Sequence, residues 1–308
     1  MSAAAGLSAR GEQMPADPHG GNVLPISATV ITLNEEANLE RCLASLSGLV
    51  SDVVIVDSGS TDRTAEIASE HGARFRLQPW LGFVAQKNVA LHMASQPWIL
   101  CVDADEAVSP ELAASIRNLF ADGDPAGDGF QVCRFTFYLG GWIRHAWYPE
   151  WRLRLVRGGR AEWRGEDPHA RLETPGPIAR LDGHLLHFSY RDLQDHLQRT
   201  IRYARIAAEA ASRSGRTVHW YHLVFSPWLA FLKALVLKQA WRDGWRGWII
   251  AFATLTKVFA KYAFVYEQQR TARREGRRTL TNGNGLLVPS RREPRRRRRG
   301  CRRAYDRN

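Results

Sequence analysis

The sequence lacks several patterns that would assign it directly to a protein class. It contains no G-x-G-x-x-G segment and no Walker lysine motif, so neither a dinucleotide fingerprint nor a P-loop is indicated. Four cysteines without metal-binding or C-x-x-C spacing argue against a disulfide framework and fit a reducing cytosol. Residues 1–25 lack the apolar core of a signal peptide, and we expect them to be disordered.

Long apolar runs and a basic body are also missing. No segment reaches the roughly 20 apolar residues that a membrane span needs. The formal charge of +12 is concentrated at the end of the chain, because residues 269–308 hold fifteen Arg and only three acids. Residues 1–268 are therefore formally neutral. Phosphate contacts of a nucleic-acid-binding protein belong in its folded body, so specific nucleic-acid binding by an Arg-rich disordered tail is the least favoured hypothesis.

Strand and helix patterns alternate through the first 120 residues. Apolar runs at 28–33, 52–57 and 98–103 are typical of buried strands, and apolar residues at helical spacing follow each of them. Asn34 is a candidate N-cap for the first helix. This alternation predicts an α/β fold with a mostly parallel sheet and helices on both faces.

Polar residues end three of these strands: Asn34, Asp57 and Asp103. Ligands bind parallel sheets at the carboxyl ends of the strands, so one shared site is expected. In an extended strand residues i and i+2 face the same side, which would direct the carboxylates of Asp103 and Asp105 to one point. Two such oxygen ligands suit Mg²⁺ or Mn²⁺, whereas the plain alternative is a strand end in solvent. Glu106 should point away and orient the turn.

The C-terminal third has a different composition. Five of the 11 Trp lie between residues 220 and 248, interspersed with Lys and Arg. The pattern predicts one helix starting at Ser226 and Pro227 and a last helix ending near Gln268. Amphipathic helices of this kind lie in the membrane interface; helices packed on the α/β domain are the alternative. The expected organisation is an α/β domain at 26–210, a helical membrane-associating region at 211–268 and the tail at 269–308.

Several motifs then occur in a distinctive order. They are ITLNEEANLERCLASL, VVIVDSGSTDRT, QKNVAL and WILCVDADE, followed by YLGGWIRHAWYPEWRLRLVRGG, PHARLE, HFSY and DGWRGWIIAF. Together they resemble the family 2 (GT-A fold) glycosyltransferases, more narrowly the branch of lipopolysaccharide core β-glucosyltransferases. The resemblance covers about residues 26–266. It implies an inverting transfer of a sugar, glucose in that branch, from a nucleotide-diphosphate donor.

The resemblance also implies a set of site residues. Nucleotide-sugar-binding residues would be Asn34, Glu36, Asp57, Lys87 and Asp103. The D-x-D pair, Asp103 and Asp105, would hold the divalent ion, Mg²⁺ or Mn²⁺, on the diphosphate. Lys87 would neutralise a phosphate, with a solvated helix lysine as the alternative, and Arg152 and Arg154 would face acceptor or phosphate, or simply edge a strand.

The general base is the position where the chain departs from the family pattern. An inverting transferase needs a carboxylate to take the proton of the acceptor hydroxyl. In the resembling branch an acid commonly follows the His of the PH segment, but here that position is Ala170. Glu166 and Asp167 are the nearest substitutes and our predicted catalytic residues, although they could be ordinary loop acids. A donor-binding relative with impaired catalysis is therefore the second hypothesis.

Partners and location follow from the resemblance and the helices together. A UDP-sugar donor and a lipid-linked saccharide or lipopolysaccharide-core acceptor are expected. The enzyme would be cytoplasmic and peripheral on the inner face of the cytoplasmic membrane. Arginines of the tail could add about 1 kcal/mol each near an anionic leaflet.

Overall fold

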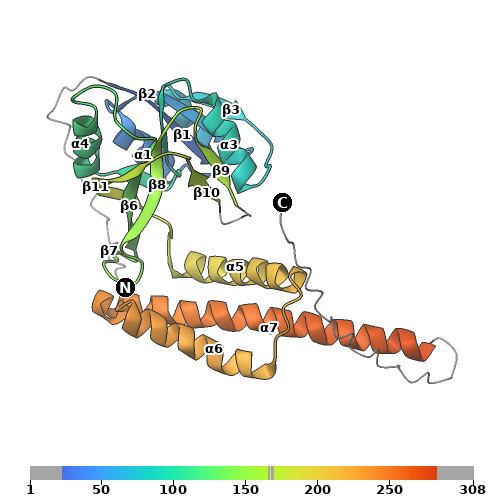
Figure 1. Ribbon diagram of the computed structural model, residues 1–308. Helices are drawn as coiled ribbons and strands as arrows, with labels where there is room; N and C mark the ends of the chain where they lie inside the picture. Colours follow the sequence, from blue (N-terminus) through green and yellow to red (C-terminus); the bar gives the residue numbers. More distant parts are fainter. Residues whose placement is uncertain (1–22, 166, 168–169, 283–308) are drawn as a thin grey trace, which may run out of the picture.

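The computed structural model describes residues 23–165, 167 and 170–282 (Figure 1). Its strands are β1 (Leu24–Thr32), β2 (Val50–Asp57), β3 (Arg74–Leu77), β4 (Trp98–Cys101), β5 (Glu106–Val108), β6 (Gly129–Tyr138), β7 (Gly141–Trp142), β8 (Glu150–Arg157), β9 (Glu162–Arg164), β10 (Arg171–Glu173) and β11 (Ile178–His187). Its helices are α1 (Leu39–Leu46), α2 (Thr64–Glu70), α3 (Phe83–Met93), α4 (Pro110–Leu119), α5 (Leu193–Arg213), α6 (Trp220–Leu232), η1 (Lys233–Leu237), η2 (Ala240–Asp243) and α7 (Gly244–Asn282).

A nine-stranded sheet organises the first 190 residues. Its order is β3-β2-β1-β4-β8-β6-β11-β5, with β7 paired to β6. β1 runs parallel to β2 and to β4, so Thr32 lies opposite Asp57 and Thr29 opposite Cys101. The carboxyl ends of β1, β2 and β4 therefore meet at one edge, as predicted. β8 is antiparallel to both β4 and β6, which makes the whole sheet mixed.

Helices cover both faces of the sheet, which confirms the predicted α/β class. Strand β1 packs through Ile26, Ala28 and Val30 in one core together with the apolar side chains of α1 and α4. On the other face Ala90 of α3 packs against Val54 of β2. Each fully buried Leu, Ile or Val contributes about 1.5–3 kcal/mol, so these two layers hold the strand ends in place.

Helix starts agree with the sequence in some places and not in others. Ser109 caps α4 and accepts a hydrogen bond from the Leu112 amide at 3.2 Å, and Pro110 is the first helical residue, an arrangement typical of helix starts. The first helix begins only after Asn38, so the prediction of Asn34 as its N-cap is wrong. Asn34 instead has a positive φ of 56°.

Helices α5, α6 and α7 pack together on one side of the sheet domain (Figure 1). Helix α5 crosses the predicted boundary at residue 210. Helix α6 begins at Trp220 and contains Pro227, so Ser226 and Pro227 do not start a helix. Helix α7 runs to Asn282, and the prediction that the disordered tail begins at 269 is wrong for residues 269–282.

Two helical segments are long and apolar enough to cross a membrane. They are Trp220–Leu237 and Ala240–Ala272, whose apolar 18-residue windows have mean hydropathies of 1.3 and 1.4. The sequence analysis missed them because isolated charged and polar side chains such as Lys233 interrupt the apolar run. Only 17% and 28% of these windows are buried, so most of their surface is not covered by the protein. Length and composition alone define such segments, and the core helix of a soluble protein meets the same conditions.

Candidate active site

An open cleft of about 2390 Å³ follows the carboxyl edge of the sheet. It begins at the end of β1 and the turn after β4, passes along β6 and β8, and reaches α5 and residues 237–239. A pocket for one small ligand usually measures roughly 300–1,000 Å³. The cleft therefore has room for two substrates side by side.

Asp57 lies at the carboxyl end of β2 and is only 2% exposed. Its carboxylate accepts hydrogen bonds from the Thr32 and Ser60 hydroxyls at 2.8 and 2.5 Å and from the Gly59 and Ser60 amides at 2.8 and 2.7 Å. Burial by itself would raise the pKa of Asp57, but these hydrogen bonds outweigh it and the pKa is lowered. Asp57 is thus an ionised group that holds the turn after β2.

Asn34 and Glu36 join the loop after β1 to the loop after β2. The Asn34 side-chain oxygen accepts a hydrogen bond from the Thr61 amide at 2.9 Å, and the Glu36 carboxylate accepts one from the Arg63 amide at 3.1 Å. Both side chains therefore join the loop that carries Glu35, which lines the cleft, to the turn that Asp57 holds, while Asn34, Glu36 and Asp57 do not line the cleft themselves. Their predicted contact with the nucleotide stays a prediction.

The two aspartates of the D-x-D segment do not lie in an extended strand. Strand β4 ends at Cys101, and the following residues turn before β5 begins at Glu106. Glu106 causes this turn, because its buried carboxylate accepts a hydrogen bond from the Asp103 amide at 2.9 Å. The expectation that Glu106 orients the turn is confirmed. The expectation that an extended strand directs both aspartates to one point is wrong.

Asp103 is held between two cations. Its oxygens lie 2.5 Å from Lys87 Nζ and 2.8 Å from an Arg154 guanidinium nitrogen. Burial opposes ionisation, but Lys87 and Arg154 hold the pKa of Asp103 well below its usual value. The Lys87 ammonium also lies 4.4 Å from the centre of the Trp163 ring, so it is fixed in the cleft rather than free in solvent.

Arg154 belongs to a buried ionic cluster under this turn. It contacts Glu106 at 2.7 Å, and Arg134 lies 3.6 Å from the same carboxylate oxygen and 2.7 Å from Glu150. The side chains of Glu106 and Arg154 are 0% and 5% exposed. Strands β5, β6 and β8 therefore supply the buried charges that hold Asp103 in place.

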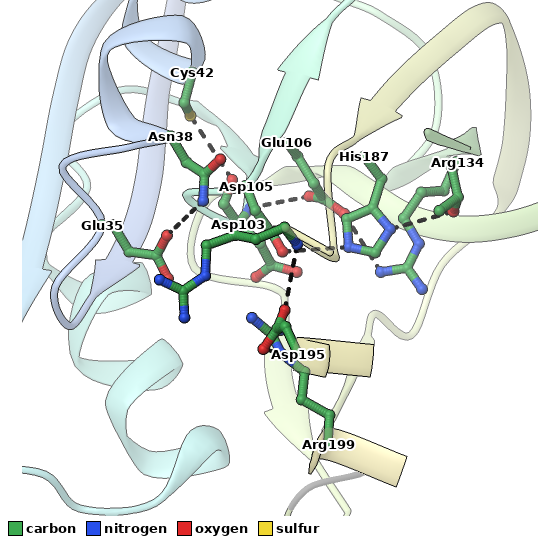
Figure 2. Close-up of polar contacts among 12 residues, drawn as sticks. Glu35, Asn38, Cys42, Asp103, Asp105, Glu106, Arg134, His187, Asp195 and Arg199 are labelled. Atoms are coloured by element: carbon green, nitrogen blue, oxygen red, sulfur yellow. Dashed lines mark hydrogen bonds and ion pairs between the residues drawn. The ribbon is translucent and has the colours of Figure 1, made fainter. Parts of the chain in front are cut away.

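Asp105 faces a residue that the sequence analysis missed. His187, at the end of β11, places Nε2 3.5 Å from the Asp105 carboxylate, and its Nδ1 lies 3.3 Å from the Thr136 hydroxyl (Figure 2). Burial of Asp105 is outweighed by His187, which lowers the pKa of this carboxyl group. The sequence feature that could have identified His187 as a site residue is its position in the HFSY motif, at the carboxyl end of a strand.

The pair of Asp105 and His187 fits a divalent ion. Metal-binding histidines usually have their other ring nitrogen held by a hydrogen bond, which is what Thr136 provides for Nδ1. The Asp105 side chain is 22% exposed, so an ion in the cleft can reach it. No group of three or more His, Cys, Asp and Glu side chains in the described part of the chain is placed to hold a metal alone. Water and substrate phosphates would complete the coordination.

The predicted base Asp167 binds the protein itself. Its two carboxylate oxygens accept hydrogen bonds from the Phe83 and Val84 amides, at 2.9 and 3.1 Å, at the start of α3. Such contacts satisfy the free amides of a helix N-terminus. Glu166 and His169 lie outside the described residues, whereas Ala170 lines the cleft.

Among the described residues that line the cleft, Glu35 is a carboxylate that forms no ion pair, although the charge of Arg199 acts on it. Five acids line the cleft among the described residues, and the other four each form an ion pair with Lys, Arg or His: Asp103, Asp105, Glu150 and Asp195. Glu35 accepts a hydrogen bond from the Asn38 side chain at 3.0 Å. Burial raises its pKa. The sequence analysis did not propose Glu35 as a site residue.

Comparison with known proteins decides the family. The Glycosyl transferase family 2 model matches residues 27–175. The lipopolysaccharide core biosynthesis glycosyltransferase LpsC of Rhizobium meliloti (strain 1021) is 32% identical over 253 residues, which cover 80% of this chain and 93% of LpsC. The chain belongs to glycosyltransferase family 2. It is therefore an enzyme, and its α/β sheet with following helices is the GT-A arrangement that the sequence predicted.

Two solved structures are also similar to this family 2 glycosyltransferase, at lower sequence identity. The crystal structure of S. aureus TarS 1-349 in complex with UDP is 16% identical, covers 81% of this chain and 92% of that chain, and gives a TM-score of 0.42. Glucosyl-3-phosphoglycerate synthase from Mycobacterium tuberculosis, crystallised with Mn²⁺, UDP and glucosyl-3-phosphoglycerate, is 27% identical. It covers 39% of this chain and 46% of that chain, with a TM-score of 0.30.

Proposed function

We propose that this family 2 glycosyltransferase moves a sugar with inversion from a UDP-sugar, UDP-glucose being the first to test, to a lipid-linked saccharide. A divalent ion, Mg²⁺ or Mn²⁺, assists. The observation that carries the proposal is the arrangement of opposite charges on one wall of the cleft. Asp105 and His187 offer ligands to a cation, and Lys87 and Arg154 offer positive charge to phosphate. Such a combination suits a metal-bound diphosphate.

Each donor-side residue has a role under this proposal. Asp105 and His187 would hold the ion, with Asp103 as the further candidate ligand. The ion would offset the negative charge that develops on the diphosphate as its bond to the sugar breaks. Lys87, already fixed beside Asp103, would add positive charge there. The nucleotide would bind at the loops that Asn34, Glu36 and Asp57 hold together.

A carboxylate must also take the proton of the acceptor hydroxyl. A base works best when its pKa is near the working pH, and burial moves the pKa of Glu35 in that direction. Because both oxygens of Asp167 are engaged at the start of α3, Glu35 fits the role better than the predicted Asp167. If Glu35 is not the base either, Ala170 favours the second candidate function, a relative that binds donor but transfers poorly.

The acceptor is proposed to arrive from a membrane. Large apolar side chains recur at helical spacing along α6 and α7 with half or more of their surface exposed in most cases. We call this the apolar face: Trp220, Phe225, Trp228, Leu229, Leu232, Leu237, Trp241, Trp245, Trp248 and Phe252. Residues 237–239 also line the end of the cleft, so the cleft opens beside this face. Exposed apolar surface of this extent marks protein or membrane contacts, and the interspersed Trp favour a membrane interface.

The relative LpsC supports a role in lipopolysaccharide core assembly, since its name states that function and it aligns with most of this chain. Such an acceptor would place the enzyme on the inner face of the cytoplasmic membrane. The neutral body gives no reason to propose nucleic-acid binding.

Thermal unfolding with UDP-glucose tests the donor site without knowledge of the acceptor. A ligand at 100 times its Kd stabilises the native state by about 2.7 kcal/mol, which corresponds to a Tm increase of roughly 5–10 °C. We expect this increase to require Mn²⁺ or Mg²⁺ and to be lost in Asp105→Asn and in His187→Asn. Glu66→Gln, on α2 away from the cleft, serves as the control. Full metal-dependent stabilisation in both site variants would contradict the assignment.

A further inference from the structure

The junction between η1 and α7 contacts the catalytic domain through Asp243. Its carboxylate is 3% exposed and accepts hydrogen bonds from three consecutive amides, those of Arg144, His145 and Ala146, at 2.9, 3.2 and 2.8 Å. The His145 ring nitrogen Nδ1 lies 3.0 Å from the same carboxylate. One side chain of the helical region therefore holds a whole turn of the loop between β7 and β8.

Arg246 makes a second contact one helical turn later. Its Nε donates a hydrogen bond to the Leu139 carbonyl oxygen at 2.9 Å. A Cβ atom on Gly141 would lie 2.7 Å from the Arg246 guanidinium carbon, so the glycine there leaves room for this side chain. Between the two contacts lies an apolar cluster that includes Tyr138 and Ile143 from the loop side and Ala240 and Ile250 from the helical side. The motifs YLGGW and DGWRGW are two sides of one contact.

Three tryptophans of this junction lie on its exposed side. Trp241, Trp245 and Trp248 are 57%, 55% and 45% exposed and belong to the apolar face. They alternate along the chain with Asp243 and Arg246. The exposed tryptophans therefore share one short segment with the two side chains that hold the loop.

The held loop is part of the cleft. Residues 144–149 all line it, and β8 follows at once, carrying Glu150 and Arg154 to the ionic cluster beneath Asp103. The loop lines the same cleft as Asp195, Arg199 and Arg202 of α5, whereas Asp57 does not line it. Its placement thus decides the shape available to the acceptor.

We propose that Asp243 and Arg246 are positioning residues that couple contact of Trp241, Trp245 and Trp248 with an anionic lipid surface to the placement of the acceptor loop, residues 139–149. The proposal rests on the proposed membrane contact. When the junction lies on lipid, the loop opens less often, and the acceptor side of the cleft is held ready for transfer.

Hydrogen exchange of the full chain with and without phosphatidylcholine–phosphatidylglycerol vesicles tests this coupling. Vesicle binding is measured separately by co-sedimentation. In the wild type we expect vesicles to slow exchange of the amides of residues 144–146 at least threefold. In Asp243→Asn vesicle binding should stay within twofold of the wild type, whereas the vesicle effect on these amides should be lost. Glu209→Gln, an exposed carboxylate on α5, is the matched control and should behave as the wild type.

Two further variants test the loop contact and the vesicle contact separately. Arg246→Gln breaks the second contact and should also lose the vesicle effect, even if Asp243→Asn folds poorly. The double change Trp245→Ser and Trp248→Ser should lose vesicle binding and leave exchange without vesicles unchanged. Vesicle binding by the wild type with unchanged exchange at 144–146 would overturn the coupling alone. Absence of vesicle binding would overturn the membrane contact as well, while metal-dependent stabilisation by UDP-glucose would still report on the donor site.

Discussion

Replacing Glu106 by Gln should destabilise the protein more than any other single charge removal around the cleft. The carboxylate is fully buried, contacts Arg154 at 2.7 Å and Arg134 at 3.6 Å, and accepts the Asp103 amide. Gln keeps the size and the bond to the amide but removes the charge that both arginines share. Removing one partner from a buried ion pair costs about 3–5 kcal/mol, because the remaining charge has no water to replace it.

We expect the lower end of this range for Glu106→Gln, because Arg154 would still form its ion pair with Asp103 and Arg134 its ion pair with Glu150. A loss of about 3 kcal/mol corresponds to a Tm decrease of roughly 6–12 °C for a domain of this size. Thermal unfolding followed by circular dichroism measures it. Glu150→Gln is the control: its side chain is 26% exposed, and we expect a loss of about 1 kcal/mol or less. The reasoning is refuted if Glu106→Gln lowers Tm no more than Glu150→Gln does.

Three further predictions concern the base and a buried histidine. Glu35→Gln should lower kcat about 10²-fold or more while metal-dependent UDP binding remains, and retained turnover would exclude Glu35 as the base. Asp167→Ala should cost about 0.5–2 kcal/mol of stability and change kcat less than tenfold, because its carboxylate caps α3; a large kcat loss at unchanged Tm would instead support catalysis by Asp167. Burial lowers the pKa of His196 to about 4, so the unfolded chain takes up the proton first as pH falls from about 6.5, and stability present above that pH declines toward pH 4. His196→Asn should reduce this decline in Tm, and an unchanged pH profile would show that other groups cause it.

Local sequence patterns predicted the parallel half of the sheet well. The mostly apolar runs at 28–33, 52–57 and 98–103 overlap the strands that end at Thr32, Asp57 and Cys101, and short runs of this kind are typical of buried strands. The cap of Ser109 followed by Pro110 was equally predictable, because both residues act within one turn. Strands and helix caps that depend on residues close together in the sequence could therefore be predicted without the structure.

Contacts between side chains that are far apart in the sequence could not be predicted in this way. His187 meets Asp105 only because β11 lies between β6 and β5, and nothing near residue 187 signals that order. The turn at Asp103 likewise depends on Glu106 being buried against Arg154 of β8. Local charge at the Arg-rich end suggested a disordered tail, yet Arg, Gln, Ala and Glu are good helix formers, and α7 continues through them to Asn282.

The number of residues in the DGWRGW segment decides which of its side chains face the catalytic domain and which are exposed. Each added residue rotates a helix by about 100°, so a single insertion between Gly244 and Trp248 would turn the following face away from its present partner. Trp248 would move toward the catalytic domain, and the close packing of Gly247 against the Ala240 carbonyl would be lost. Length in this segment is therefore under stronger constraint than composition: a Trp can be exchanged for another large apolar residue, but no residue can be added or removed.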